Sequence, residues 1–236
     1  MAFEQVFKQI DDKLRVDEGC ATALDYVEQS SWILFLKYLD DLDQTREQSA
    51  LLTGEDYRPI IDHEYRWSSW AMPKTNGEYD RQKALVGDDL IEFVNLKLFP
   101  YLAKFLETAQ EGTVEKKIGV IFKEVKNKIA SGYNMREVLE LVDSLRFQTS
   151  EEKHEMSELY ESRLAQMGNA GRNGGEYYTP RPLIRTIVKV IDPKVGESFY
   201  DGACGSAGFL CEGYNYMHSK VTGPEDERKL QDNTFR

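Results

Sequence analysis

One long stretch of the sequence, residues 21–48, constrains the fold of this chain because its apolar residues recur every three to four positions. That spacing is the period of an α-helix, and it predicts one long helix. The centre of the stretch, WILFLKYL at residues 32–39, is apolar on almost every side. A helix with such a surface is buried, so we expect this segment to form the middle of a helical bundle.

Other stretches of the first two thirds have the same period. An amphipathic stripe near the N-terminus consists of Phe3, Val6, Phe7, Ile10 and Leu14. Further helices are predicted over residues 88–107, 114–130, 134–147 and 150–167. Residues 53–89 are richer in glycine, proline and polar residues, which predicts a long irregular insert. Trp67 and Trp70 lie in it; they either anchor the insert on the helices or bind a partner.

The predicted helix over residues 114–130 is rich in lysine at its polar positions, which are Lys116, Lys117, Lys123, Lys126 and Lys128. A solvated helix face explains these lysines without any function. Contact with DNA phosphates or with an acidic partner is the alternative, because lysine neutralises phosphate charge in nucleic-acid complexes.

The helical pattern ends at MGNAGRNGGE, residues 167–176, whose glycines predict a linker or mobile loop. We therefore expect a helical domain over residues 1–167 and a second domain over residues 168–236. The second domain begins with a helix over residues 179–193, which has a proline near its start. Residues 196–217 then predict a buried strand that ends at Phe199 and Tyr200, a glycine turn and a helix, the first half of a nucleotide-binding α/β unit.

Composition excludes several classes of protein. The net charge of −11 argues against a chain that coats nucleic acid through bulk charge alone. No apolar run reaches the roughly 20 residues of a membrane helix, and the N-terminus lacks the pattern of a secretory signal. Cys20, Cys204 and Cys211 form no disulfide framework and no zinc-ligand spacing, which predicts a reducing, cytoplasmic location.

The glycine turn carries the chemistry that the sequence suggests. Asp201 follows the predicted strand, where open α/β sheets bind ligands. Gly202, Gly205 and Gly208 recur every three residues, which lets the backbone approach a ligand closely. The N–H groups of the following helix favour anionic or polar groups. The spacing is not the G-x-G-x-x-G of dinucleotide sites, and an ordinary tight turn remains the alternative.

A second motif, GGEYYTPRPLI, lies upstream at residues 174–184. Tyr177 and Tyr178 offer aromatic faces beside a helix start that proline restricts. Thr179 offers a hydroxyl and Arg181 a cation, so the helix terminus could hold the carboxylate of an amino-acid-like ligand. The alternative is an ordinary helix start that Thr179 caps.

Taken together, the two motifs resemble the modification subunit of type I restriction–modification systems, an adenine-N6 DNA methyltransferase. The resemblance rests on YYTPR at residues 177–181 and on DGACGSAGFL at residues 201–210. A third segment, LFLKYL at residues 34–39, resembles that family's N-terminal domain. The resemblance implies a mainly α protein, in which a helical domain precedes the incomplete start of a Rossmann-like α/β methyltransferase domain.

The resemblance also implies the cofactor and the partners. The cofactor is S-adenosylmethionine, and the residues expected to bind it are Glu176, Tyr177, Tyr178, Thr179, Pro180, Arg181, Asp201, Gly205, Ser206, Ala207 and Gly208. The substrate is an adenine flipped out of duplex DNA, whose N6 takes the methyl group. The implied partners are DNA and the specificity and restriction subunits, in a cytoplasmic complex without a membrane.

The Asn-Pro-Pro motif that holds the adenine amine in this family does not occur in the sequence. We therefore assign no catalytic residue, expect the chain to be an amino-terminal part of the enzyme, and expect no methyl transfer by it alone. One alternative is a helical interaction module that docks the specificity subunit and DNA. Another is an S-adenosylmethionine enzyme acting on RNA or protein. Cys204 is predicted to be a packing residue, and the scattered histidines show no metal-ligand spacing.

Overall fold

The computed structural model describes residues 2–75, 77–146, 179–205 and 207–235. The chain divides into two compact units, Met1–Ala170 and Gly171–Arg236, and each is described by itself. The limit between them lies outside the described residues, so the boundary expected after residue 167 stays a prediction. The predicted helix over residues 150–167 also lies outside the described residues.

The first unit is helical. Its elements in chain order are α1 (Ala2–Arg15), α2 (Ala23–Thr53), η1 (His63–Tyr65), α3 (Trp67–Trp70), β1 (Lys74–Thr75), β2 (Glu78–Tyr79), α4 (Gly87–Glu92), η2 (Phe93–Leu98), α5 (Phe99–Thr108), α6 (Val114–Glu124) and α7 (Gly132–Asp143). α4, the π-helical turn η2 and α5 follow one another directly, and they confirm the helix predicted over residues 88–107. Strands β1 and β2 pair as a short antiparallel hairpin.

The long helix α2 confirms the opening prediction. The Thr22 side chain accepts a hydrogen bond from the Asp25 backbone N–H, and the Asp25 carboxylate accepts one from the Thr22 N–H. This capping box satisfies N–H groups that every helix start leaves without partners. α2 ends at Gly54, whose φ of +73° favours glycine. Its central residues Trp32, Ile33, Leu36 and Leu39 are buried in the core, as expected for the middle of a bundle.

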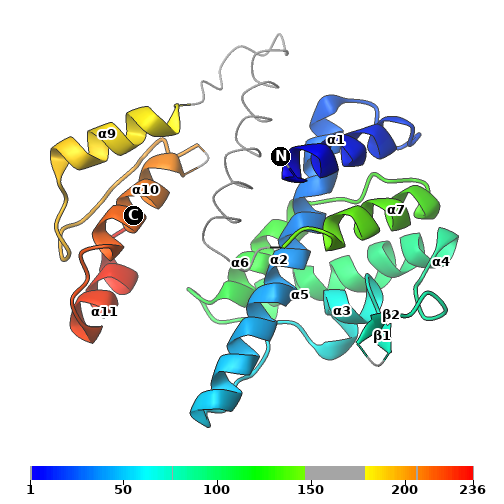
Figure 1. The fold of residues 1–236 in the computed structure, drawn as a ribbon, viewed down its shortest axis with the longest axis horizontal. Coiled ribbons are helices and arrows are strands. Elements are labelled where there is room, and N and C mark those ends of the chain that lie inside the picture. The colour runs from blue at the N-terminus through cyan, green and yellow to red at the C-terminus, as the bar shows by residue number, and fades with distance from the viewer. Residues whose placement is uncertain (1, 76, 147–178, 206, 236) are drawn as a thin grey trace. The chain divides into compact units, whose positions relative to one another are not determined.

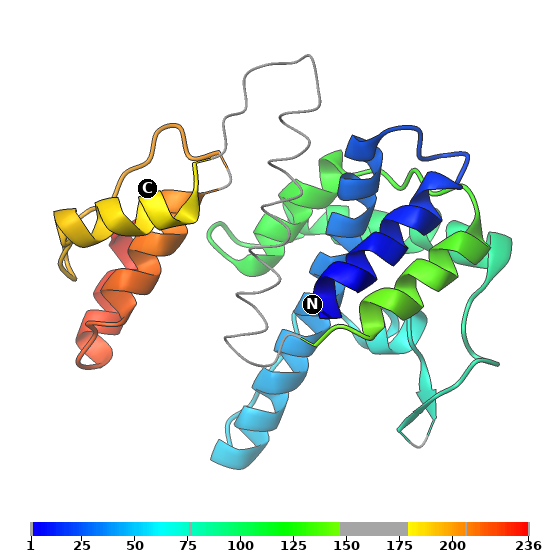
Figure 2. The same cartoon turned by 45° about the horizontal axis from the view of Figure 1, so that its top comes forward.

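The other helices pack around α2 in the first unit. α1 lies beside α7, and both lie against α2 (Figure 2). α5 and α6 form a closely packed pair. A Cβ atom at Gly119 of α6 would lie 2.1 Å from the backbone nitrogen of Leu106, so only glycine allows these two backbones to approach this closely.

The insert between α2 and α4 is more ordered than predicted, because it contains η1, α3 and the β1–β2 hairpin. Trp67 and Trp70 are only 2% and 3% exposed and belong to the core. The indole N–H of Trp67 donates to the Asp143 carboxylate at 2.7 Å. The anchoring role proposed for the two tryptophans is therefore confirmed.

The helix predicted over residues 114–130 ends early, at Glu124, so its prediction is wrong for residues 125–130. The backbone of that segment is bonded by side chains from elsewhere in the sequence. The Gln29 side chain donates to the Lys126 carbonyl and accepts from the Lys128 N–H. The Asp17 carboxylate accepts from the N–H groups of Ala130 and Ser131. These long-range bonds replace the helical ones.

Asp25 gives the first unit a predictable acid sensitivity. Hydrogen bonds from the Lys128 ammonium at 2.7 Å and from Thr22 lower the pKa of Asp25 to about 2, although burial opposes them. An unfolded aspartate has a pKa of about 3.9. The ionised carboxylate therefore stabilises the fold above about pH 4, and this contribution is lost as the pH falls towards about 2.

Urea unfolding between pH 2 and pH 6 tests this expectation. The stability difference between the unchanged protein and Asp25→Asn should be largest above about pH 4 and should shrink as the pH falls towards about 2. Lys128→Met should remove most of the same pH dependence, because it removes the main cause of the lowered pKa. A difference that stays constant over this range would contradict the assignment.

The second unit consists of α9 (Arg181–Ile191), α10 (Gly208–His218) and α11 (Pro224–Asn233). The strand predicted before the glycine turn is reduced to one parallel bridge between Phe199 and Phe235, with the Phe199 N–H donating to the Thr234 carbonyl at 2.6 Å. Tyr200, expected to be buried, is 78% exposed because a single bridge leaves its face uncovered. Two helices, α10 and α11, lie between the two bridged residues, so this parallel pairing is reached through a helical crossover.

Candidate cofactor site

The first motif leads into α9. Thr179 and Pro180 are exposed, and Pro180 occupies the position before the helix. No side-chain hydrogen bond caps this end, so the alternative of a helix start capped by Thr179 is wrong. α9 has a proline in its first turn. Proline lacks a backbone N–H, and at this position an N–H would have no partner within the helix. Glu176, Tyr177 and Tyr178 lie outside the described residues, and their predicted roles stay predictions.

The second motif forms an exposed turn between Phe199 and α10. The Asp201 carboxylate accepts a hydrogen bond from the Ala203 N–H at 3.2 Å, which places the acid at the start of the turn. The Ala207 N–H donates to the Cys204 carbonyl at 2.7 Å and closes the turn. Ser206, another predicted site residue, lies outside the described residues.

Two residues of this turn have left-handed backbone conformations. Gly205 has a φ of +50°, and Ala207, directly before α10, has a φ of +59°. A residue with a side chain pays roughly 1–2 kcal/mol for this conformation, so Ala207 is strained and must be held by its surroundings. Apart from its chain neighbours, no described residue has an atom within 4 Å of a Cβ atom built at Gly205, so the described residues leave the space over the turn open.

The start of α10 is suited to an anionic or polar group. Among the described residues, no side chain caps the start of α10. The first N–H groups of a helix have no hydrogen-bond partner within the helix. These groups carry the positive end of the helix dipole. Together with the open space over Gly205, they could receive the carboxylate of an amino-acid-like ligand.

Arg181 brings the two motifs together. Its Nη1 atom donates to the Gly208 carbonyl at 3.2 Å, so the first residue of α9 contacts the first residue of α10. The same Nη1 atom lies 3.6 Å from the Glu212 carboxylate, and Nε of Arg185 lies 3.1 Å from it. Arg185 and Glu212 lie outside both motifs and were not predicted. The one signal in the sequence is spacing: Arg185 lies four residues after Arg181, and Glu212 lies four residues after Gly208, which is one helical turn in each case.

The cysteines and histidines that the structure describes are Cys20, Cys204, Cys211, His63 and His218. Cys204 and Cys211 are exposed, so the prediction that Cys204 is a packing residue is wrong. His218 stacks on Tyr214 with ring centroids 5.5 Å apart. Among the residues that the structure describes, no group of three or more histidines, cysteines or acids could hold a metal ion. None of the described helices is long and apolar enough to cross a membrane.

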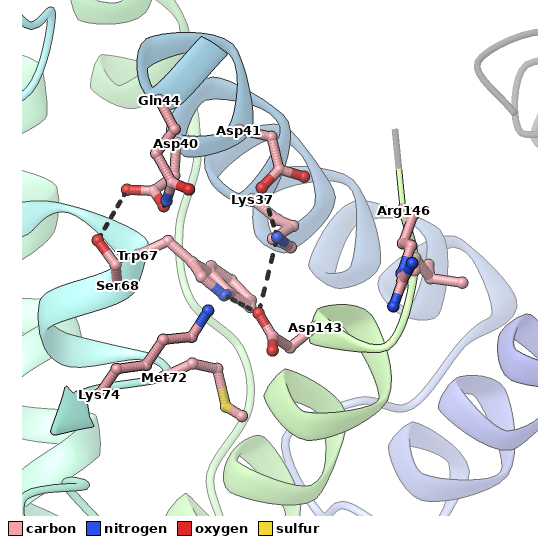
Figure 3. A pocket seen from close by; sticks show the side chains of 11 residues that line it. Lys37, Asp40, Asp41, Gln44, Trp67, Ser68, Met72, Lys74, Asp143 and Arg146 are labelled. Atoms are coloured by element: carbon pink, nitrogen blue, oxygen red, sulfur yellow. Dashed lines mark hydrogen bonds and ion pairs between the residues drawn. The ribbon is translucent and has the colours of Figure 1, made fainter. Parts of the chain in front are cut away.

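A pocket of about 400 Å³ lies in the first unit, between α2, the insert and the end of α7 (Figure 3). Three of its charged side chains form ion pairs with one another. The Lys37 ammonium lies 2.6 Å from the Asp41 carboxylate and 3.7 Å from that of Asp143. Asp40 accepts from Ser68 and Gln44, and burial raises its pKa. These contacts connect the insert to the helices, and Lys74 and Arg146 also line the pocket.

The fold and the turn define a class of protein. A helical unit, together with a second unit that has a helix, an exposed glycine turn, a second helix and a parallel bridge, is the arrangement of a helical domain followed by the start of an α/β domain. Comparison with known families gives the same result. The protein-family model described as HsdM N-terminal domain matches residues 3–161, and the protein-family model described as N-6 DNA Methylase matches residues 151–233. The chain therefore belongs to the HsdM family of type I restriction–modification methylase subunits.

Individual relatives agree. The EcoEI methylase subunit of Escherichia coli is 34% identical over the whole chain, and the StySJI methylase subunit of Salmonella typhimurium is 28% identical over 91% of it. A modification subunit of a putative type I restriction enzyme from Vibrio vulnificus superposes with a TM-score of 0.84 at 34% identity, covering 99% of this chain and 49% of that one. The chain spans 46% and 35% of the length of the two curated relatives.

Proposed function

We propose that this chain supplies the amino-terminal part of an enzyme that transfers a methyl group from S-adenosylmethionine to N6 of adenine in DNA. The contact between Arg181 and the Gly208 carbonyl carries the proposal, because it joins the two cofactor motifs beside the exposed turn. The family match to N-6 DNA methylases supports the reaction class.

The described residues fit the amino-acid part of S-adenosylmethionine. The N–H groups at the start of α10 would receive its carboxylate, and the Asp201 carboxylate would attract its ammonium group. Gly205 leaves room for the cofactor to approach the backbone. Thr179 and Pro180 are proposed to contribute to the same site, as are Glu176, Tyr177 and Tyr178, which lie outside the described residues. When bound, the cofactor supplies a methyl group on a positively charged sulfur.

The proposed partners follow from the family. The adenine is presented by duplex DNA, and a specificity subunit selects the target site. A restriction subunit joins the same complex in the cytoplasm. One solved chain from work on complex assembly in the type I R-M system is 37% identical, with a TM-score of 0.69, which supports an assembled state.

Methyl transfer in the full-length protein tests the proposal. With its specificity subunit and labelled S-adenosylmethionine, the full-length protein should label adenine N6 in duplex DNA. Residues 1–236 alone should transfer no label, because they contain no Asn-Pro-Pro motif to orient the adenine amine. Label in cytosine, RNA or protein, or no binding of the cofactor by the full-length protein, would refute the proposal.

The helical unit supports a second role, docking of DNA or of an acidic partner. Two lysines of the predicted basic segment are used internally: Lys116 pairs with Glu111, and Lys128 with Asp25. Lys117 and Lys123 are exposed on α6, and no ion pair to them is recorded among the described residues. Replacing both by glutamine should weaken binding of nonspecific duplex DNA and lower its salt dependence, measured by fluorescence anisotropy.

A further inference from the structure

The side chains that join α9 to α10 form a matched arrangement. Arg181 and Arg185 are one turn apart on α9, and Gly208 and Glu212 are one turn apart on α10. Arg181 contacts both positions of α10, at 3.2 Å from the Gly208 carbonyl and 3.6 Å from the Glu212 carboxylate. Arg185 contacts the same carboxylate at 3.1 Å. Glu212 is therefore the common partner of two guanidinium groups.

This arrangement is shielded from water more than a surface ion pair is. The side chains of Arg181 and Glu212 are 16% and 13% exposed, and that of Arg185 is 37% exposed. Ion pairs on an open surface contribute little, because water and salt screen them. Planar guanidinium groups that reach both a carboxylate and a carbonyl fix the orientation of the helix that carries them.

The backbone next to Gly208 needs such a restraint. Ala207, the residue before it, has a φ of +59°, a conformation that a side chain disfavours. Ile184 of α9 lies so close to Gly208 that a Cβ atom there would be 2.8 Å from its Cδ1 atom. The start of α10 thus approaches α9 closely just where the strained turn enters the helix, and strain of this kind persists only where the surroundings hold it.

We infer that Arg181, Arg185 and Glu212 form a positioning clamp that holds the glycine turn for the cofactor. The clamp acts through the backbone at Gly208, so Arg181 is a positioning residue in this arrangement and Glu212 joins the site without touching the ligand. The inference rests on the proposed function, because it assigns these residues to the same cofactor site. It predicts that neutralising Glu212 disorders the turn locally.

Glu212→Gln in the full-length protein tests the clamp, with Glu225→Gln as the matched control. Glu225 makes an ion pair with Lys229 on α11 and is 84% exposed, so the same chemical change there should have little effect. In Glu212→Gln, hydrogen exchange of the Cys211 amide, which bonds to the Ala207 carbonyl, should accelerate about tenfold. The Kd for S-adenosylmethionine should rise by about the same factor. Arg185→Lys, which keeps a cation beside Glu212, should retain most of the affinity.

Each outcome is decisive. Glu212→Gln with exchange and affinity equal to the Glu225→Gln control would overturn the clamp. Faster exchange spread over α9 and α11 would show a general loss of stability and would also overturn it, as would weaker binding with an unchanged Cys211 amide. If the unchanged protein binds no S-adenosylmethionine but the Cys211 amide alone exchanges faster in Glu212→Gln, the clamp stands and the proposed cofactor fails.

Discussion

Replacing Gly205 by valine should weaken S-adenosylmethionine binding about a hundredfold or more and abolish methylation by the full-length protein. Gly205 has a φ of +50°, which a β-branched residue resists. Its missing side chain leaves open space over the turn, where the cofactor is proposed to approach. Valine would therefore disturb the backbone and fill the site together. Calorimetric titration of the cofactor, alongside the methylation rate, measures both effects.

Cys204→Ala is the matched control for the same turn. Cys204 is exposed, and among the described residues its thiol makes only a weak contact, 3.9 Å from the Gly205 carbonyl oxygen. Adenine-N6 transfer needs no nucleophilic thiol, so affinity and rate should stay within about twofold of the unchanged protein. If Cys204→Ala removes activity while Gly205→Val binds the cofactor normally, the site assignment is wrong.

Arg136→Met should lower the free energy of unfolding of the helical unit by about 3 kcal/mol. Arg136 is only 6% exposed, and its guanidinium group donates to the carbonyls of Leu85 and Ala71. These bonds connect α7 to the insert. Methionine fills a similar space but donates nothing, so it leaves a buried carbonyl at Ala71 without its charged donor. Urea unfolding monitored by tryptophan fluorescence measures the loss.

Arg15→Met is the control for this prediction. The Arg15 side chain is 65% exposed and pairs with Asp12 at 3.4 Å on the same helix, so its loss should cost at most about 0.5 kcal/mol. Trypsin should also cleave the insert of Arg136→Met faster than that of Arg15→Met, at Lys74 or Arg81. Equal stability of the two variants would show that Arg136 does not hold the insert.

Sequence patterns predicted the elements that depend on neighbouring residues. The apolar period over residues 21–48 predicted α2, and the proline near residue 181 predicted the start of α9. The glycine spacing after Asp201 predicted a turn leading into a helix, which is α10. These features depend on contacts within a few positions along the chain, where helical period and backbone preference suffice.

The strand at Phe199 shows where such patterns fail. Its residues have the apolar character of a buried strand, but burial depends on the partners that cover each face. In the described residues it has one parallel bridge, to Phe235, and Tyr200 beside it is exposed. The local sequence pattern therefore predicted the turn and the helix correctly, and it predicted a strand where the described residues form one bridge.

The sequence by itself determined the helical class, the family motifs and the position of the glycine turn. Tertiary structure decided where the lysine-rich helix stops, because Asp17 and Gln29, about a hundred residues away, bond its extended continuation. The tertiary structure also decided that Arg181 contacts Glu212, a residue that belongs to neither motif. Hydrogen bonds and ion pairs join whatever side chains the packing of helices brings within reach, and a local pattern carries no information about which ones those are.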